Sequence, residues 1–420
     1  MVQIHRECGS PEKRKNDAAE LSHTLSVLVA GDLNMRAPLD ALIGSGREAA
    51  IFEELGPLFE RTDVRLCNLE NPLTDAGEPI PKIGPNLRGP EAGVNIIAAA
   101  GFDAAVLANN HIGDYGAEGV ARTLRVLDSH GIGRTGAGMD LHEARRPWIT
   151  RRGERTLAVV SVTENQFGTA SAQRPGGSGF DMRRLCADVI SARERADFVL
   201  IVFHGGQEHN PVPSPGTVDR YRSLVDAGAD AIVGMHSHCP QGWEIYRGKP
   251  IVYSTGNFLF CSRDPLIDPG SPWFFGYLPR IEFSDVSPRL TLHPYRFTAD
   301  GRRVHLLAGE EKRKFMDYLG DLSAVIADPA QLIAHYESWC VLKAPGCLAR
   351  LRGGASGGSQ QTAVDDGLYS LHCFATEALV ELLRTYLRIL YDGREAACAQ
   401  GIAAVEERSK IPFPICDDKS

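Results

Sequence analysis

Two histidines, His236 and His238, end a run of small apolar residues in the segment VGMHSH. In an extended segment, side chains i and i+2 point to the same side, so both imidazoles can face one cluster. Imidazole is a common ligand of divalent transition metals. Taken alone, the pair fits a metal site and a pair of surface histidines about equally well.

Other residue types that bind divalent ions recur in separate parts of the chain. Asp32 and Asn34 occur in GDLN, Glu70 in NLEN, Asn110 in NNH and His204 in FHGG. Hard and borderline ions take carboxylate, amide and imidazole ligands, and a carboxylate can bridge two ions about 4 Å apart. Each residue also has an ordinary alternative, such as a helix cap, a solvated charge or a core histidine. A shared metal centre accounts for all of them if their segments belong to one sheet.

Apolar, β-rich runs precede these residues, and amphipathic segments separate the runs. TLSVLVAGD, DFVLIVFHGG and ADAIVGMHSH have the pattern of buried strands, whereas GVARTLRVLDSHG and TVDRYRSLVDAGA have helical spacing and glycine stops. Strands that alternate with helices predict an α/β sheet, which binds ligands beyond the carboxyl ends of its strands. We therefore expect the candidate ligands at one edge of a sheet.

The bulk properties exclude several classes of protein. A formal net charge of −8 argues against a nucleic-acid-binding surface, which is usually basic. The polar N-terminus has no apolar stretch of signal-peptide length, and no later segment has the ~20 uncharged apolar residues of a membrane span. The 10 cysteines are scattered without a CxxC pair, as is typical of reduced thiols. We therefore expect a cytoplasmic protein that binds neither nucleic acid nor membranes.

The composition divides the chain into three parts. Residues 1–23 form a polar N-terminal arm, 24–307 an α/β domain, and 308–420 a helical C-terminal extension with a flexible Gly/Ser-rich loop at 352–361. Within the domain, YLPRIEFSDVSPRLTLHPYRFTADGRRVHLL predicts two or three antiparallel strands. Within the extension, LYSLHCFATEALVELLRTYLRILYDG has the length and spacing of one long helix.

Six segments, over about residues 25–265, resemble the CapA-type (poly-γ-glutamate capsule) branch of the calcineurin-like metallophosphoesterases: AGDLN, NLENPL, LANNHIGDYGAEGVARTL, GAGMDLHEARRP, HGGQEH and DAGADAIVGMHSHCPQGWEIYRGKPIVYSTGNFLF. The resemblance implies a four-layer α/β/β/α sandwich with a two-metal centre. Asn34 and Glu70 depart from the histidine and aspartate usual at these positions, which predicts a weaker or differently shaped first metal site. By this resemblance Asp32 and His238 would bind one ion, Asn110, His204 and His236 the other, Glu70 would bridge them, and His111 would transfer protons beside them.

Phosphoester hydrolysis is the commonest activity of this fold, but the two departures favour another chemistry. The branch is also similar to the metal-dependent epimerases that invert the C-terminal residue of lasso-peptide precursors. Our favoured hypothesis is therefore a cytoplasmic Cα epimerase of a ribosomal precursor peptide, with proton-transfer groups on two faces of the substrate. Its cofactor would be two divalent ions, with Mn²⁺ favoured over Fe, Zn, Ca or Mg. The proton-transfer candidates are His111, Glu208 and His209, although Glu208 and His209 fit an ion pair and a surface loop equally well.

Two other functions remain open. One is hydrolysis or transfer by a phosphoesterase or a polyglutamate-type amide hydrolase, and the other is a binding module without turnover. Glu164, Asn165 and Asn257 follow predicted strands, so they are candidate substrate contacts or turn residues. The four tryptophans are expected to be core or interface anchors: Trp148, Trp243, Trp273 and Trp339.

Overall fold

The computed structural model of the chain describes residues 24–261, 271–352 and 360–411. The predicted arm at 1–23 and most of the predicted loop at 352–361 lie outside these residues.

The first sheet contains eight strands in the order β16-β15-β14-β1-β2-β3-β4, with β13 also paired to β1. Strands β1, β2, β3, β4 and β13 run parallel, whereas β14, β15 and β16 form an antiparallel meander, as predicted. Every residue of β1 is buried, as its apolar pattern predicts for a central strand. The strands are β1 (Leu25–Asn34), β2 (Val64–Leu69), β3 (Ala104–Val106), β4 (Gly133–Thr135), β13 (Asn257–Phe260), β14 (Phe275–Phe283), β15 (Arg289–Phe297) and β16 (Val304–Leu306).

The second sheet contains six strands in the order β11-β12-β10-β9-β7-β6. Its four central strands are parallel, and an antiparallel strand closes each edge. A short pair, β5 (Ala137–Gly138) and β8 (Gly176–Gly177), lies outside both sheets. The six strands are β6 (Trp148–Arg152), β7 (Arg155–Thr163), β9 (Phe198–His204), β10 (Ala231–Met235), β11 (Trp243–Tyr246) and β12 (Lys249–Val252).

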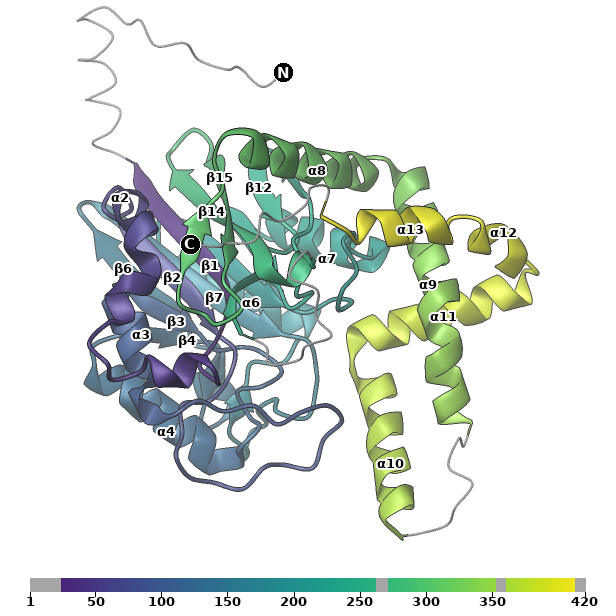
Figure 1. Cartoon of the computed structure of the whole chain (residues 1–420), viewed down its shortest axis with the longest axis horizontal. Helices are drawn as coiled ribbons and strands as arrows, with labels where there is room; N and C mark the ends of the chain where they lie inside the picture. Colours follow the sequence, from purple (N-terminus) through teal and green to yellow (C-terminus); the bar gives the residue numbers. More distant parts are fainter. Residues whose placement is uncertain (1–23, 262–270, 353–359, 412–420) are drawn as a thin grey trace, which may run out of the picture.

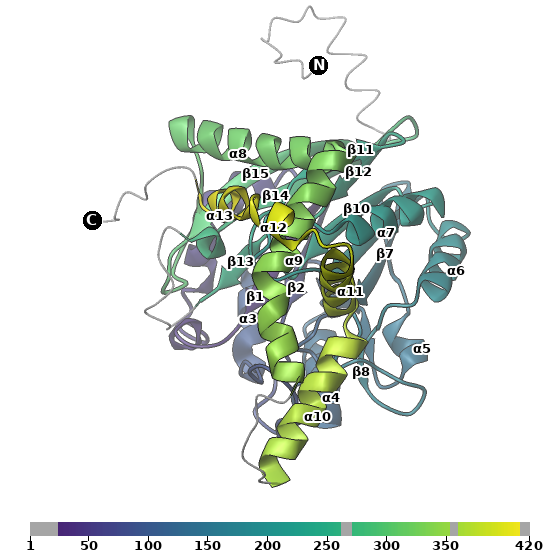
Figure 2. The same ribbon diagram turned by 90° about the vertical axis from the view of Figure 1, so that its right-hand side faces the viewer.

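The two sheets pack face to face between helices. Across the interface the rings of Phe198 and Phe283 stack with centroids 5.1 Å apart. Helices α3 (Val94–Ala99) and α4 (Gly116–Ser129) lie on the first sheet's side, and α6 (Met182–Arg193) and α7 (Pro215–Asp226) pack on the second sheet (Figures 1 and 2). The predicted four-layer α/β/β/α sandwich is therefore confirmed.

Shorter helical segments fill the connections between these layers. They are η2 (Leu39–Ala41), η3 (Glu48–Leu55), α2 (Gly56–Phe59), η4 (Glu91–Gly93), α5 (Leu141–Ala144) and η5 (Pro272–Phe274).

The C-terminal part of the chain is helical and lies along one side of the sandwich (Figure 1). Helix α8 buries Phe315, Leu319 and Leu322 in the main core, whereas later helices share a separate apolar cluster that includes Trp339 and Leu383. The helices are α8 (Gly309–Ala327), α9 (Pro329–Leu351), α10 (Gln360–Ala375), α11 (Glu377–Tyr391), α12 (Glu395–Ala399) and α13 (Ile402–Arg408).

The prediction of one long helix near the C-terminus is wrong, because α10 and α11 meet at a sharp bend (Figure 1). The helix breaks at Thr376, which is buried and has an extended backbone (φ −81°, ψ 122°). Immediately after the break, the carboxylate of Glu377 accepts hydrogen bonds from the backbone and side-chain amides of Asn165 at 2.8 and 2.6 Å. A contact with the distant β7 end therefore accompanies a bend that helical spacing alone does not predict.

Within the described ranges, no helix is both long and apolar enough to cross a bilayer. The eight cysteines in those ranges are free thiols, as their scattered spacing predicts.

Candidate metal centre

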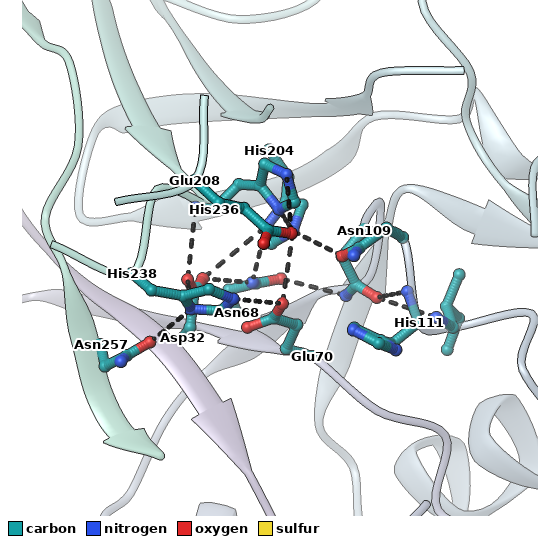
Figure 3. A network of polar contacts seen from close by, with 12 residues as sticks. Asp32, Asn68, Glu70, Asn109, His111, His204, Glu208, His236, His238 and Asn257 are labelled. Carbon is teal, nitrogen blue, oxygen red and sulfur yellow. Dashed lines mark hydrogen bonds and ion pairs between the residues drawn. The ribbon is translucent and has the colours of Figure 1, made fainter. Parts of the chain in front are cut away.

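Six of the seven predicted ligands converge where strands of both sheets end (Figure 3). The first sheet delivers Asp32 from β1, Glu70 after β2 and Asn110 after β3; the second sheet delivers His204 from β9 and the histidine pair after β10. The seventh, Asn34, is buried at the end of β1. All seven residues have at most 7% of their surface exposed: Asp32, Asn34, Glu70, Asn110, His204, His236 and His238.

One group of ligand atoms surrounds the Nε2 atom of His204. This atom lies 2.9 Å from Asn110 Oδ1, 3.0 Å from His236 Nδ1 and 3.5 Å from Glu70 Oε1. Ligand atoms about 2.1 Å from one ion and at right angles to each other lie about 3.0 Å apart. The distances from His204 Nε2 to these three atoms are therefore similar to those between ligands of a single ion.

A second group adjoins the first through Glu70. Its Oε1 atom lies 3.9 Å from His238 Nε2, and His238 Nδ1 lies 3.6 Å from Asp32 Oδ2. Possible ligand atoms of Glu70, His236 and His238 all lie within 4.8 Å of one another, and so do those of Asp32, Glu70 and His204. Glu70 is the residue common to both groups, as a bridging carboxylate must be.

Unpartnered buried atoms show that these residues suit a cation. Neither carboxylate oxygen of Glu70 has a hydrogen-bond partner, and neither polar side-chain atom of Asn34 has one. Both side chains are fully buried, where an uncompensated polar group is costly. A divalent ion would supply the missing partner of the Glu70 carboxylate, so the buried Asp, Glu and His groups fit a divalent metal site.

The electrostatics of the pocket also favour cation binding. Burial, followed by the repulsion of Asp32, holds the pKa of Glu70 well above its usual range, and burial raises the pKa of Asp32. Burial also holds the pKa of His204 well below its usual range and lowers that of His236 to about 4. The lowered pKa values favour neutral rings at His204 and His236, which can offer lone pairs to a cation, and a bound cation would favour the ionised form of both carboxyl groups.

The backbone around the histidine pair corrects one premise of the sequence analysis. His236 and His238 are not in an extended segment; they follow β10 with positive φ angles of 92° and 53°. His209 also has a positive φ, 62°. Such conformations cost a non-glycine residue about 1–3 kcal/mol each and concentrate at functional sites. Both imidazoles reach the centre because of this unusual turn, not because of strand alternation.

Three asparagines hold the ligands in place. Asn257 Oδ1 lies 2.8 Å from His238 Nδ1, which orients Nε2 toward Glu70. Asn68 Nδ2 donates to Asp32 Oδ1 at 2.7 Å, and Asn109 Nδ2 donates to Asn68 Oδ1 at 3.2 Å. From the sequence, Asn257 was a candidate substrate contact or turn residue, and the structure places it against a candidate ligand. Asn68 and Asn109 were missed, although they stand beside Glu70 and Asn110 in NLEN and NNH.

His111 lies at one end of the network, where its backbone N–H donates to Asn109 Oδ1 at 3.1 Å (Figure 3). Its Nδ1 atom is 2.7 Å from Asp114 Oδ2, and the other oxygen of Asp114 accepts a 2.6 Å hydrogen bond from Lys82. All three side chains are buried. Burial lowers the pKa of His111, and the nearby Lys82 adds to this effect. Asp114 and Lys82 were also missed; the only signal was an aspartate three residues after His111.

Glu208 and His209 lie in the loop that follows β9. Glu208 Oε1 is 3.8 Å from His236 Nε2, and its side chain is 52% exposed, so it stands at the rim of the centre. The ring centroid of His209 is 6.1 Å from that of His238. Trp273 also belongs to this rim, because its ring lies 4.8 Å from that of His238. The prediction that all four tryptophans are core or interface anchors is confirmed, since Trp273 packs against the main core as well as against His238.

The other two residues that were candidate substrate contacts or turn residues, Glu164 and Asn165, face the helical part of the chain instead. Glu164 is 1% exposed, beneath the start of α11, with Arg220 Nη1 3.7 Å away. Asn165 is held by Glu377, the first residue of α11.

A four-layer sandwich with a carboxylate- and histidine-rich cluster at its strand ends defines the class of calcineurin-like metallophosphoesterases. Within this class, residues 26–262 match the sequence model of the bacterial capsule synthesis protein PGA_cap family. This match covers more than half of the chain, which therefore belongs to that family.

Relatives with curated names agree with this assignment. Over 245 residues the chain is 29% identical to capsule biosynthesis protein CapA of Bacillus anthracis, covering 56% of this chain and 60% of that protein. Over 266 residues it is 33% identical to a probable polyglutamine synthesis accessory protein of Mycobacterium tuberculosis, covering 60% and 68%. The chain thus spans about three fifths of the length of the Bacillus relative.

Among solved structures, the 5'-nucleotidase of Candida albicans is a distant match. Its TM-score is 0.40 at 10% identity, covering 66% of this chain and 53% of the nucleotidase, a likeness too low to support an argument about function.

Proposed function

We propose that this chain is a metal-dependent hydrolase in which His111 transfers a proton at the candidate metal centre. The observation that carries the proposal is that His111 belongs to the polar network of the candidate metal centre through Asn109 (Figure 3), while Asp114 Oδ2 lies 2.7 Å from its Nδ1 and orients the ring. When bound, a pair of divalent ions supplies Lewis acidity toward a carbonyl or phosphoryl oxygen. Two ions, rather than one, are part of the proposal.

The residues around His111 suit a proton-transfer role. The carboxylate of Asp114, 2.7 Å from Nδ1, favours the tautomer in which Nδ1 carries hydrogen, so that Nε2 is free to exchange a proton with the substrate. The ammonium group of Lys82 occupies the other oxygen of Asp114 and lies 3.3 Å from His111 Nδ1. Burial, together with this positive charge, lowers the pKa of His111, which favours the neutral imidazole that a proton acceptor requires.

The proposed substrate class is based on the names of the relatives. Their names refer to capsule biosynthesis and to polyglutamine synthesis, which suggests an amide of a glutamate-type chain rather than a nucleotide. A phosphoester remains an alternative, because the class name refers to that chemistry. A cytoplasmic location and a peptide-type substrate stay predictions from the sequence.

A second candidate function is Cα epimerisation of a peptide, which requires proton-transfer groups on two faces of the substrate. Glu208 supports this candidate, because its carboxylate stands at the rim 3.8 Å from His236, on a different loop from His111. Hydrolysis requires fewer groups and is therefore our first choice.

One set of incubations separates these functions. Protein loaded with Mn²⁺ is incubated in D₂O with a p-nitrophenyl phosphodiester, a γ-glutamyl oligomer and a precursor-type peptide, and the products are analysed by mass spectrometry. Cleavage of either of the first two substrates supports the hydrolase. Deuterium at one Cα of an uncleaved peptide supports the epimerase and contradicts the hydrolase. If the metal-loaded protein changes none of the three substrates, the result supports a binding module. The matched control is His111→Gln, which lacks the proposed proton-transfer group.

A further inference from the structure

The loop between β9 and α7, residues 205–214, lies between the metal centre and the C-terminal helices. On its inner side Glu208 approaches His236 to 3.8 Å, and the backbone N–H of His209 donates to Ser237 O at 2.7 Å. Ser237 stands between the candidate ligands His236 and His238. The position of this loop is therefore coupled to the segment that presents two ligands.

On its outer side the same loop is held by two C-terminal helices. Asn210 Oδ1 lies 2.9 Å from His335 Nε2 of α9, and Gln207 Nε2 donates to the backbone oxygen of Ala378 in α11 at 2.6 Å. At the end of the loop, Ser214 donates to Glu381 of α11 at 2.7 Å. His335, Asn210 and Gln207 are all buried, so water does not compete freely for these bonds.

The direction of the His335 hydrogen bonds is determined by its neighbours. Arg408 Nη1 lies 3.3 Å from His335 Nδ1, and a guanidinium can only donate. His335 Nδ1 therefore accepts, and Nε2 carries the hydrogen that is donated to Asn210 Oδ1. Burial, together with the charge of Arg408, lowers the pKa of His335 to about 4, which keeps this neutral tautomer at pH 7.

We propose that α9 and α11 position the 205–214 loop against the metal centre and that His335 is the main positioning residue. These helices follow the last residue matched by the family model, residue 262, so this support comes from a part of the chain outside that match. Only the expected change in metal binding rests on the proposed metal centre. The contacts between the loop and the two helices do not depend on it.

The test compares three variants as full-length proteins. His335→Ala removes the donor to Asn210, whereas His335→Gln keeps a side-chain N–H near the same place. Tyr386→Phe is the matched control, since it removes a 2.6 Å bond to Glu395 within the helices and leaves the loop untouched. Two readouts are measured: amide hydrogen exchange of residues 205–214 in the metal-free protein, and Mn²⁺ affinity by titration calorimetry.

We expect His335→Ala to accelerate exchange of the loop amides about tenfold and to weaken Mn²⁺ binding, with the His335→Gln and Tyr386→Phe variants close to the unmodified protein. Unchanged loop exchange in folded His335→Ala, or equal acceleration in Tyr386→Phe, would overturn the proposal. If His335→Ala does not fold, Gln207→Glu provides the same comparison, because it removes the donor to Ala378 at constant size. An unmodified protein that binds no Mn²⁺ contradicts the proposed metal centre, while the exchange data still decide the loop proposal.

Discussion

The replacement Glu164→Gln tests how the sandwich and α11 are joined. Glu164 is 1% exposed, neither of its carboxylate oxygens has a hydrogen-bond partner, and Arg220 Nη1 is 3.7 Å away. Burial raises the pKa of Glu164 from 4.5 to about 8, against the attraction of Arg220, and the nearby Glu377 adds to the increase. We therefore expect Glu164 to be protonated in the folded protein at pH 7.

The expected change in the free energy of unfolding follows from the difference between the pKa of Glu164 in the unfolded and folded states. One pKa unit corresponds to about 1.4 kcal/mol, so an increase from 4.5 to about 8 corresponds to about 5 kcal/mol. The folded state binds the proton more tightly than the unfolded state, so the stabilisation is complete below pH 4.5 and is lost as the pH rises to about 8. Glutamine has nearly the same shape as glutamic acid but does not ionise, so the variant should keep this stabilisation as the pH rises.

The assay is urea unfolding of the metal-free protein between pH 5 and pH 9, with Glu164→Gln compared to the unmodified chain. We expect little difference at the acidic end and a stabilisation of the variant by up to about 5 kcal/mol at the alkaline end. Glu337→Gln is the matched control of opposite sign, because hydrogen bonds from Arg394 lower the pKa of Glu337. If Glu164→Gln destabilises the protein by the same amount at every pH, Glu164 is an ionised partner of Arg220 and this reasoning is wrong.

Four further predictions concern the metal centre and its support. Glu70→Ala should lose both ions, because the residue belongs to both ligand groups, and unchanged metal content by elemental analysis would contradict its bridging role. His111→Gln should retain metal but lose turnover by about 10²–10⁴-fold, as measured by single-turnover kinetics; full activity would exclude its proton-transfer role. Asn257→Ala should weaken Mn²⁺ binding by about 10–100-fold in calorimetry, because His238 loses its orienting partner. In the unmodified chain the pKa of His335 is lowered from 6.5 to about 4, so the free energy of unfolding falls as the pH drops from 6.5 to 4. In urea titrations His335→Gln should remove about 3 kcal/mol of this loss. An unchanged pH profile would contradict a neutral, buried His335.

Much of the centre could be predicted from the sequence because its signals are local. Apolar runs that end in a polar residue identify strands such as β1 and β9, and the carboxyl ends of parallel strands in one sheet lie at the same edge. The rule correctly put Asp32 and His204 at strand ends, but its expectation of a single sheet was wrong, because β1 and β9 belong to different sheets. The motif resemblance added the pairing of the two sheets, which periodicity does not contain.

Several site residues could not be predicted, because their positions depend on contacts between distant segments. Lys82 lies in an irregular segment without periodicity, and only the folded chain places it against Asp114. Glu164 and Asn165 follow strand β7, just as the candidate metal ligands follow other strands, but α11 covers the end of β7. The same contact accompanies the break between α10 and α11 that the helical pattern does not indicate.

The sequence by itself determined which segments are strands and which polar residues stand at their ends, because hydrophobic periodicity and turn residues act over a few positions. Only the tertiary structure decided which strand ends stay open and which are covered by a helix, and it alone gave His236 and His238 the positive φ angles that turn both rings inward. These features depend on packing between residues far apart in the chain, and no local pattern encodes such contacts.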